Sequence, residues 1–584
     1  MNIANPKDIR IVKGLPPVAK KGDRISIDSE FWGQEKSRLH RPHGRFAFLG
    51  CSFDGQTVYW IDDETQIQEF YNRIDAGVHI YHNSKYDLRQ LGRFAQLSQR
   101  KNLWDTMLIE QIMFSGYYSD FSLADLVRRY LDTYMPKEVR KEFSDDTVSQ
   151  EMSKEQIEYS AMDVAYTWSV AQAQKEKISE DEIQIWRGIE LPFLWALLGM
   201  SGVRLDSEKW IALARKNEQT AKEIQDRYGH WTTEPATGRA KKDKEVFVGL
   251  NLNSPAQVKK HFAECGLTKL KSTDAEALEK IVAEGDGHDA ATIFAAELLT
   301  YRTYAKRSST YGEKFVTDYV EPDGKIYADI FQIGAETGRT SCRAPNLQNQ
   351  PHEVEYRECF IADEGKCIIV ADWGSQEPKF AAHFSQDAGL IDALNSDEKL
   401  YVRIAREALD IHITKASPEY THIKSTILGL FYGMSANGLS KRIGVSENDA
   451  QHMIDSVLDT YPGIADYMRN QKRAKDYVTS VTGRKIWLNK YSFQWERNAL
   501  NAPIQGSAAD AMKIAAARFM QTKPADWELL LLVHDEIVLS VPEASCKDAK
   551  KFLAECMISV AEELHEGIKG SAEVFDGKSW ACKH

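Results

Sequence analysis

The segment LLLLVHDEIVLSVP, residues 529–542, constrains the fold more than any other part of this 584-residue chain. Two apolar arms flank His534, Asp535 and Glu536, a pattern that predicts a buried β-hairpin with acids at its turn. Burying carboxylates without partners is costly. A bound divalent cation would offset that cost, whereas a charged turn in an edge hairpin would leave the acids in water.

Composition favours a chain of several globular domains. Hydrophobic residues make up 43% and charged residues 27%. No apolar run approaches the ~20 residues of a membrane span, and the N-terminal residues lack signal-peptide and transit-peptide features, so we expect a cytoplasmic location. The eight Cys residues form no CxxC pair, which favours reduced thiols over a zinc ribbon. A net charge of -12 by itself disfavours a nucleic-acid partner, but acidic sites can mask local basic tracks.

The chain divides into three stretches by periodicity. Residues 24–177 alternate strands and helices, residues 180–320 are mainly helical, and the remainder mixes strands with long helices. In the first stretch, strands are predicted at 23–30, 45–53, 57–62 and 77–83, and helices at 84–94 and 153–177. Residues 228–249 are polar and read as a loop or hairpin, either a solvated connection or a basic contact with nucleic acid.

Four acids of the first stretch lie on segments that would bring them together. ISIDSE puts Asp28 and Glu30 on one face of a strand. HNSKYD places Asp87 in the first turn of a helix, and EYSAMD places Tyr159 and Asp163 four apart on another helix. Converging carboxylates suit a pair of hard divalent ions, with a tyrosine to orient the attacking water. Taken singly, each pattern is more typical of a solvated face or of packing.

A second set of candidates follows in the last stretch. KCIIVADW ends a predicted strand with Asp372, which would meet Asp535 and hold two Mg²⁺ ions with it. The segment THIKSTILGLFYG places Lys424, Leu428 and Tyr432 on one helical stripe. A lysine there suits a triphosphate, and an aromatic ring suits packing near a base. An ordinary amphipathic helix is the alternative.

Amide and guanidinium side chains gather in two further segments, TGRTSCRAPNLQNQP and ERNALNAPIQGSAAD. The side chains are those of Arg339, Asn346, Gln348, Arg497, Asn501 and Gln505. Such groups suit the minor groove, whose acceptors are nearly the same for every base pair. Helix capping and hydrogen bonding between helices are the alternative.

The motifs, taken in order, resemble a known family. The three acidic motifs of the first stretch resemble those of DEDD-type 3′→5′ exonucleases with a tyrosine. TGRTS, PNLQNQP, ADWGSQEPKFAAHFSQD, K-x7-YG, YPGI, TGRKIWL, NAPIQGSAAD and VHDE follow one another as in family A DNA polymerases of the bacterial polymerase I and phage types. The resemblance runs from about residue 24 to beyond 542. No stretch resembles the flap-nuclease domain of bacterial members, which fits a phage enzyme or a trimmed bacterial one.

The resemblance implies a multidomain α/β and α+β fold. A ribonuclease-H-like exonuclease domain would occupy residues 1–180, and a right-hand polymerase domain would occupy residues 181–584. Within the latter, the expected subdomains are the thumb at about 205–325, the palm at about 326–400 and 485–584, and the fingers at about 401–484.

The resemblance also implies roles for individual residues. The palm metals would be bound by Asp372, Asp535 and the backbone carbonyl of Trp373, with Glu536 also catalytic. The deoxynucleotide would meet Lys424, Tyr432, His422 and Glu377, the last blocking a ribose 2′-hydroxyl. Primer-template DNA would meet Arg339, Asn346, Gln348, Arg497, Asn501, Gln505 and His534. Three positions depart from the family pattern, namely Lys379, Tyr420 and Leu428.

The implied activity is template-directed addition of deoxynucleotides to a primer 3′-OH, with proofreading. Mg²⁺ would serve both sites, two ions in each, with Mn²⁺ as a substitute. A single-stranded 3′ end would reach the acids Asp28, Glu30, Asp87 and Asp163 for hydrolysis. The sequence defines no replisome partner. A stand-alone exonuclease with a DNA-binding module and a single-subunit RNA polymerase are the alternatives, the latter disfavoured by Glu377.

Overall fold

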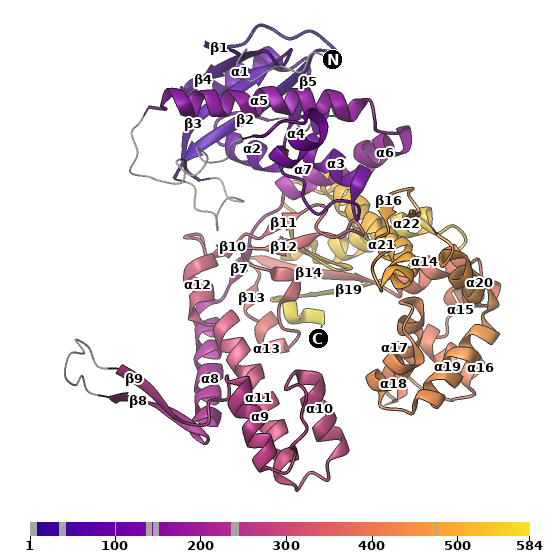
Figure 1. Ribbon diagram of the computed structural model, residues 1–584. Coiled ribbons are helices and arrows are strands. Elements are labelled where there is room, and N and C mark those ends of the chain that lie inside the picture. Colours follow the sequence, from indigo (N-terminus) through magenta and orange to yellow (C-terminus); the bar gives the residue numbers. More distant parts are fainter. Residues whose placement is uncertain are drawn as a thin grey trace.

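The computed structural model describes most of the chain as two units joined by a helical connector (Figure 1). The described residues are 9–33, 43–97, 99, 101–135, 143, 151–234, 244–417, 419–474 and 476–583. Every residue predicted for the two sites lies within these ranges.

The first unit is built on a six-stranded sheet with strand order β1-β4-β3-β2-β5-β6. Its strands are β1 (Arg10–Lys13), β2 (Arg24–Trp32), β3 (Arg45–Ser52), β4 (Thr57–Ile61), β5 (Val78–Tyr81) and β6 (Leu103–Asp105). β2 pairs antiparallel with β3 and parallel with β5, so the strand that carries two predicted acids lies inside the sheet. The four predicted strands are confirmed, with small differences at their ends.

Helix α5 (Lys154–Lys175) lies across this sheet and contacts β2 and β3 (Figure 1). It begins at a capping box in which Ser153 and Gln156 each accept a hydrogen bond from the other's backbone N–H. The helices predicted at 84–94 and 153–177 are confirmed as α2 and α5. The other helices of this unit include α1 (Ile67–Ile74), α2 (Ser84–Leu91), α3 (Thr106–Phe114) and α4 (Leu123–Leu131).

A continuous helical run connects the first unit to the second. It consists of α6 (Glu180–Ile185), the π-helical turn η5 (Trp186–Glu190) and α7 (Leu191–Leu198). The sequence of α7, LPFLWALL, is apolar on nearly every side, which predicts burial rather than a surface position. Accordingly, α7 packs against α21 (Trp495–Thr522), a long helix of the second unit.

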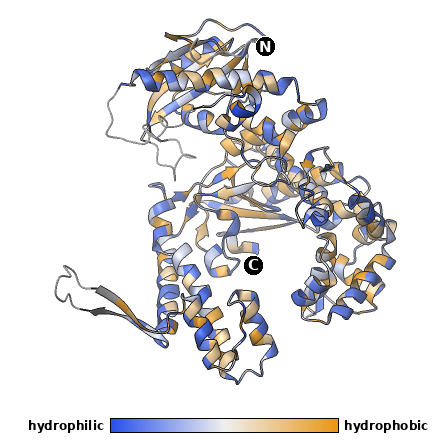
Figure 2. Cartoon of the chain, in the orientation of Figure 1, coloured by the Kyte–Doolittle hydropathy of each residue, from blue (hydrophilic) through white to orange (hydrophobic). Residues whose placement is uncertain are grey.

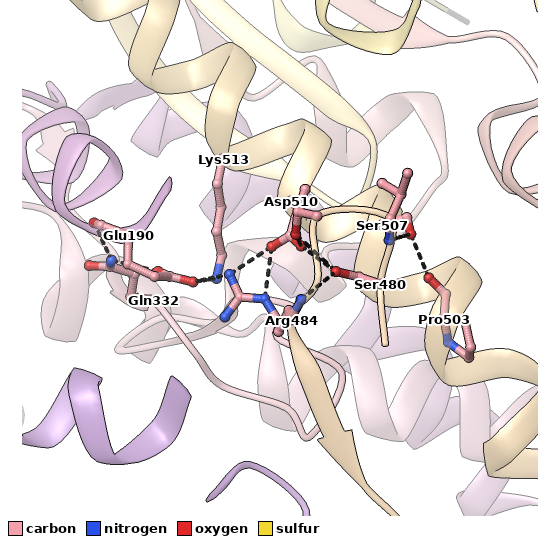
Figure 3. Close-up of polar contacts among 10 residues, drawn as sticks. Glu190, Gln332, Ser480, Arg484, Pro503, Ser507, Asp510 and Lys513 are labelled. Carbon is pink, nitrogen blue, oxygen red and sulfur yellow. Dashed lines mark hydrogen bonds and ion pairs between the residues drawn. The ribbon is translucent and has the colours of Figure 1, made fainter. Parts of the chain in front are cut away.

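A buried ionic cluster ties this connector to α21 (Figure 3). Glu190 accepts hydrogen bonds from Arg484 at 2.5 Å and from Lys513 at 2.6 Å. Arg484 also donates to Asp510 at 2.8 Å. None of the four side chains is more than 2% exposed. Two acids and two bases thus compensate one another, as buried charges require.

The second unit is centred on a four-stranded antiparallel sheet with strand order β17-β18-β14-β19. The strands are β14 (Lys366–Trp373), β17 (Glu528–Val533), β18 (Glu536–Pro542) and β19 (Ala572–Gly577). β17 and β18 form the predicted hairpin, and β18 pairs with β14 so that Asp372 lies opposite Glu536. At the turn, His534 has a left-handed backbone with φ of 56°. The hairpin prediction is therefore confirmed.

Two helical arms extend from the region of this sheet (Figure 1). One arm contains α8 (Ser207–Asp226), α9 (Pro255–Glu264), α10 (Ala275–Glu284), α11 (Ala290–Thr310) and α12 (Glu313–Tyr319). The other contains α15 (Ala388–Asn395), α16 (Leu400–Leu409), α17 (Glu419–Phe431), α18 (Ala436–Ile443), α19 (Glu447–Thr460) and α20 (Pro462–Gln471). The polar interruption at 228–249 is a hairpin of β8 (Gly229–Glu234) and β9 (Lys244–Gly249), whose connecting residues 235–243 lie outside the described residues.

Shorter elements complete the second unit. The strands are β7 (Val203–Leu205), β10 (Lys325–Ile326), β11 (Asp329–Phe331), β12 (Ser341–Arg343), β13 (Phe360–Ile361), β15 (Tyr477–Thr479) and β16 (Lys485–Trp487). The helices are η6 (Leu347–Asn349), α13 (Val354–Arg357), α14 (Gln376–Ser385), η7 (Glu543–Ser545), α22 (Cys546–Leu564) and η8 (Trp580–Lys583).

Hydrophobic residues are concentrated on the strands and on the inward faces of the helices (Figure 2). The largest core cluster includes apolar residues of β14, β17, β18, α21 and α22, and a second cluster fills the first sheet. Each sheet is thereby a rigid base for the side chains at its strand ends. In the described part of the chain, no helix combines the length and apolarity needed to cross a bilayer.

The structure corrects one expectation about the cysteines. Cys367 and Cys546 form a disulfide, whereas reduced thiols were predicted throughout. Their Cα atoms are 6.8 Å apart, within the range that a disulfide spans. The bond joins β14 to the start of α22, which packs on it. The two residues are 179 positions apart, and cysteine spacing alone does not reveal such a pairing.

Two candidate carboxylate sites

The first site forms where β2 passes beneath α5. Asp28 and Glu30 point to the same face of β2, and Asp163 comes from α5, which crosses that face. One carboxylate oxygen from each of the three residues lies within 4.8 Å of the other two. Three acids this close repel one another unless a cation or protons neutralise them. The local chemistry therefore fits divalent metal ions held by oxygen ligands.

Asp87 joins this cluster from the first turn of α2. It is 2% exposed and accepts hydrogen bonds from the Ser29 backbone N–H at 3.1 Å and from the Ser29 hydroxyl at 2.6 Å. Burial raises the pKa of Asp87 well above its ordinary value, and the charges of Asp28 and Glu30 raise it further. The structure thus brings together the four acids that the sequence singled out.

Tyr159 lies one helical turn before Asp163 on α5. It is 3% exposed and belongs to a small apolar cluster with Trp32, Ala47 and Phe143. Its ring is therefore held by packing beside the acidic cluster rather than left in solvent.

Asp105, in the nearby WDTM segment, has a structural role. It caps α3 by accepting hydrogen bonds from Met107 and Leu108, and it also binds the backbone N–H and hydroxyl of Ser84. These contacts fix the start of α2, the helix that carries Asp87.

The second site forms at one end of the four-stranded sheet of the second unit. Asp372 is near the end of β14, and Asp535 is in the turn between β17 and β18. Burial raises the pKa of Asp535 to about 6, and the negative charge of Asp372 is the next cause. Burial likewise raises the pKa of Asp372, although a hydrogen bond from Lys583 opposes this. The two acids are thus electrostatic neighbours, as predicted, in surroundings that disfavour their charge unless a cation is bound.

Glu536 differs from these two acids because basic and polar partners surround it. It is 4% exposed and accepts hydrogen bonds from Trp580 and from Lys583, the latter at 3.1 Å. Arg357 lies 3.6 Å from its carboxylate. Sequence reasoning missed all three partners because they come from α13 and η8, far along the chain, with no local motif to mark them.

Glu377 connects Arg339, a predicted DNA contact, with Tyr432, a predicted nucleotide contact. Its carboxylate accepts hydrogen bonds from Arg339, at 2.5 Å, and from Tyr432. The predicted stripe of α17 needs one correction, since the helix ends at Phe431 and Tyr432 follows it. The Tyr432 N–H still bonds the Leu428 carbonyl at 2.9 Å, so its position continues the last turn.

The remaining predicted contacts lie in different surroundings. Asn346 accepts a hydrogen bond from the Gln348 backbone at 3.1 Å, and the Gln348 side chain donates to Thr340 and to the Leu532 carbonyl. Asn346 thus caps the helix η6, as the capping alternative predicted. Burial lowers the pKa of the His534 imidazole, and the charge of Arg339 lowers it further.

The face of α21 that carries the other amides lines a small pocket. Arg497, Asn501 and Gln505 surround a cavity of about 160 Å³ together with Trp487. Asn501 also donates to the Tyr432 carbonyl at 3.1 Å, so this face reaches the end of α17.

Two predicted triphosphate contacts have no ion pair with the acids of the second site among the described residues. His422 and Lys424 lie on α17 with exposed side chains, and among the described residues no ion pair links Lys424 to Asp372 or Asp535. Trp373 is 4% exposed and donates its indole N–H to the Met557 carbonyl at 3.0 Å. That bond fixes the end of β14 beside Asp372.

Fold and sites together define a family. Residues 216–582 match the model of DNA polymerase family A, and residues 15–179 match the model of a 3′-5′ exonuclease. The chain belongs to DNA polymerase family A. The predicted fold class, an exonuclease domain followed by a polymerase domain, is confirmed.

Named relatives agree with this assignment. DNA polymerase I of Chloroflexus aurantiacus is 30% identical over 451 residues, which cover 72% of this chain and 46% of that protein. DNA polymerase I of Borreliella burgdorferi is 27% identical over 606 residues, which cover 97% of this chain and 63% of that protein. The chain thus spans less than two thirds of the length of each of these relatives.

A solved structure matches nearly the whole chain. It is the POL domain of Pol1 from M. smegmatis in complex with a DNA primer-template and dNTP. Its TM-score is 0.81 at 26% sequence identity, and the match covers 98% of this chain and 100% of that one. The arrangement of the two units is therefore that of a known polymerase.

Proposed function

We propose that this chain is a DNA-directed DNA polymerase that extends a primer 3′-OH and proofreads with a 3′→5′ exonuclease. The observation that carries the proposal is the pair Asp372 and Asp535, which interact electrostatically at one end of the four-stranded sheet in a member of this family. The second acidic cluster, on a separate sheet, supports the second activity. DNA replication of the phage type is the corresponding biological role.

Asp372, Asp535 and the Trp373 carbonyl would hold Mg²⁺, with Mn²⁺ as a substitute. The ions would supply Lewis acidity that activates the primer 3′-OH and neutralises the leaving pyrophosphate. Glu536, which the sheet register places opposite Asp372, would support the geometry of that ligand.

Other side chains would bind and select the nucleotide. Lys424 and His422, exposed on α17, would meet the triphosphate, and Tyr432 would pack near the base. Closure of this helical arm would bring them to the palm and couple correct pairing to catalysis. Glu377, already fixed by Tyr432 and Arg339, would exclude a ribose 2′-hydroxyl.

The duplex would lie against the palm and α21. Its sequence-tolerant contacts would come from Arg339, Asn346, Gln348, Arg497, Asn501, Gln505 and His534. The pocket lined by Arg497, Asn501 and Gln505 supports this role for that face of α21.

The exonuclease would act on a frayed primer end. Asp28, Glu30, Asp87 and Asp163 would bind the metal ions, and Tyr159 would orient the attacking water. A mispaired terminus unpairs more readily, so it would reach this site as a single strand. The partners in this account are primer-template DNA, dNTPs and a single-stranded 3′ end.

The sequence-based boundaries and location belong to the same proposal. The exonuclease domain would span residues 1–180 and the polymerase domain residues 181–584, with the thumb, palm and fingers as given above. The proposal includes a cytoplasmic location, in the host if the gene is carried by a phage.

Two matched variants test the assignment. Asp535→Asn should abolish extension of a paired primer while single-stranded DNA is still degraded from its 3′ end. Asp28→Asn should give the converse. Retained extension by Asp535→Asn would refute the polymerase site, and loss of both activities in either variant would point to misfolding. Replacing dNTPs with rNTPs in the same assay tests the RNA polymerase alternative.

A further inference from the structure

The Lys583 side chain contacts two of the acids at the second site. Lys583 Nζ lies 2.5 Å from Asp372 Oδ2 and 3.1 Å from Glu536 Oε2. Both acids are therefore bridged by one ammonium group. The Lys583 side chain is 23% exposed, so water screens these contacts only in part.

The bridge depends on a rigid anchor rather than on a freely moving side chain. Trp580, at the start of η8, is 1% exposed and donates its indole N–H to Glu536. Its ring meets Phe360 edge-on at 5.4 Å, and the Arg357 guanidinium lies 4.5 Å from the ring centroid. β19, which precedes η8, pairs with β14 along its length. These contacts hold η8 in place, so that Lys583 reaches the acids.

The charges of the site explain why a lysine belongs there. Three carboxylates lie at one end of the sheet, those of Asp372, Asp535 and Glu536. Of these three acids, Arg357 forms an ion pair with Glu536 alone. Without a cation near Asp372, burial and mutual repulsion would destabilise the folded palm. An ammonium group can compensate that charge, but as a cation it also competes with a divalent ion for the same carboxylate.

We propose that Lys583 is a built-in counter-ion for Asp372 and Glu536 in the metal-free palm, and that metal binding displaces it from Asp372. Lys583 thereby sets how tightly the palm binds metal before DNA and nucleotide arrive. The proposal rests on the assignment of Asp372 as a metal ligand made above. It assigns a role to a residue that lies outside every acidic motif of the chain.

The direct test is Mn²⁺ binding to the full chain without DNA, with unbound Mn²⁺ measured by electron paramagnetic resonance. An Asp28→Asn background weakens the exonuclease site so that palm binding dominates. In that background, Lys583→Met should bind Mn²⁺ about tenfold more tightly, since one competing cation is gone. Unchanged or weaker binding would overturn the proposal. Lys578→Met is the matched control, because Lys578 pairs with Glu543 at the other end of the sheet.

A second measurement needs no substitution at this position. Amine-reactive labelling of the wild-type chain, read by peptide mass spectrometry, should show Lys583 becoming several-fold more reactive when Ca²⁺ is added. Lys578 should keep its reactivity. Equal labelling of Lys583 with and without the ion would contradict displacement, whatever the stability of Lys583→Met.

Mn²⁺ binding by Asp372→Asn separates an error in the counter-ion role from an error in the proposed metal site. If Asp372→Asn leaves Mn²⁺ binding in the Asp28→Asn background unchanged, the palm metal site itself is wrong. If Asp372→Asn removes binding but Lys583→Met leaves it unaltered, the metal site stands and only the counter-ion role is refuted.

Discussion

Arg339 and Tyr432 hold the same carboxylate, that of Glu377, from opposite parts of the second unit. Arg339 comes from the segment before η6, and Tyr432 follows the last turn of α17. The position of Glu377 is thus fixed before any nucleotide binds. A fixed acid of this kind is suited to reject a substituent by its bulk and its desolvation cost.

Glu377→Ala should therefore relax the choice of sugar. The ratio of kcat/KM for a dNTP to that for the matching rNTP should fall by roughly 10- to 200-fold, the range for removing a small steric block. Steady-state incorporation of single nucleotides measures it. Glu364→Ala, an exposed surface change, should leave the ratio unaltered. A ratio that Glu377→Ala does not change would remove Glu377 from sugar selection.

Tyr159→Phe should separate packing from chemistry at the exonuclease site. The ring fills the same cluster with Trp32 and Phe143, so the melting temperature should stay within about 1 °C of wild type. Degradation of single-stranded DNA should slow by roughly 100-fold because the hydroxyl proposed to orient the attacking water is gone. Wild-type degradation by a folded Tyr159→Phe chain would show that the hydroxyl has no part in hydrolysis.

Arg484→Met should destabilise the junction between the two units. It leaves Glu190 and Asp510 buried with one fewer cation, which typically costs about 3–5 kcal/mol of unfolding free energy. Urea denaturation followed by tryptophan fluorescence measures the change. Arg469→Ala, which removes an exposed pair with Asp466, should cost no more than about 1 kcal/mol. Similar losses in the two variants would argue against a structural role for the buried cluster.

His565 should make the protein sensitive to acid. It is fully buried, and burial lowers the pKa of its imidazole to about 4, with the charges of Lys379 and His383 acting in the same direction. The unfolded chain takes up this proton near pH 6.5. Stability from His565 is therefore complete above pH 6.5 and is lost as the pH falls towards 4, by about 3 kcal/mol.

Melting temperatures measured at pH 7.5 and pH 5 test whether His565 lowers the stability as the pH falls. The decrease between the two pH values should be smaller for His565→Gln than for wild type. His412→Gln alters an exposed histidine and should behave as wild type. A decrease as large in His565→Gln as in wild type would assign the acid sensitivity to other groups.

Local patterns predicted the elements that carry the acids. The period of two in ISIDSE and the apolar arms around His534 each reflect burial of a strand face, so β2 and the β17–β18 hairpin were foreseen. Spacing of four did the same for Tyr159 and Asp163 on α5. Convergence of the separate segments was expected from the order and spacing of the motifs together, which resemble those of a known family.

Contacts between distant segments were not predictable in this way. Lys583 meets Asp372 across 211 positions, and Arg484 meets Glu190 across 294. A lone lysine or arginine in a sequence is most often solvated, so neither carries a local signal of burial. The end of α17 at Phe431 was also missed, because Gly433, with φ of 62°, ends the helical path despite an unbroken stripe.

We propose that one chain builds DNA at Asp372 and Asp535 and trims it at the acids of the first sheet. Extension of a primer labelled at its 5′ end and mispaired at its 3′ end, with and without dNTPs, reports both activities in one gel. With Mg²⁺ alone we expect stepwise shortening, and with dNTPs added we expect trimming of the mismatch followed by full-length product. Shortening that continues unchanged when dNTPs are present, with no longer product, would contradict the account.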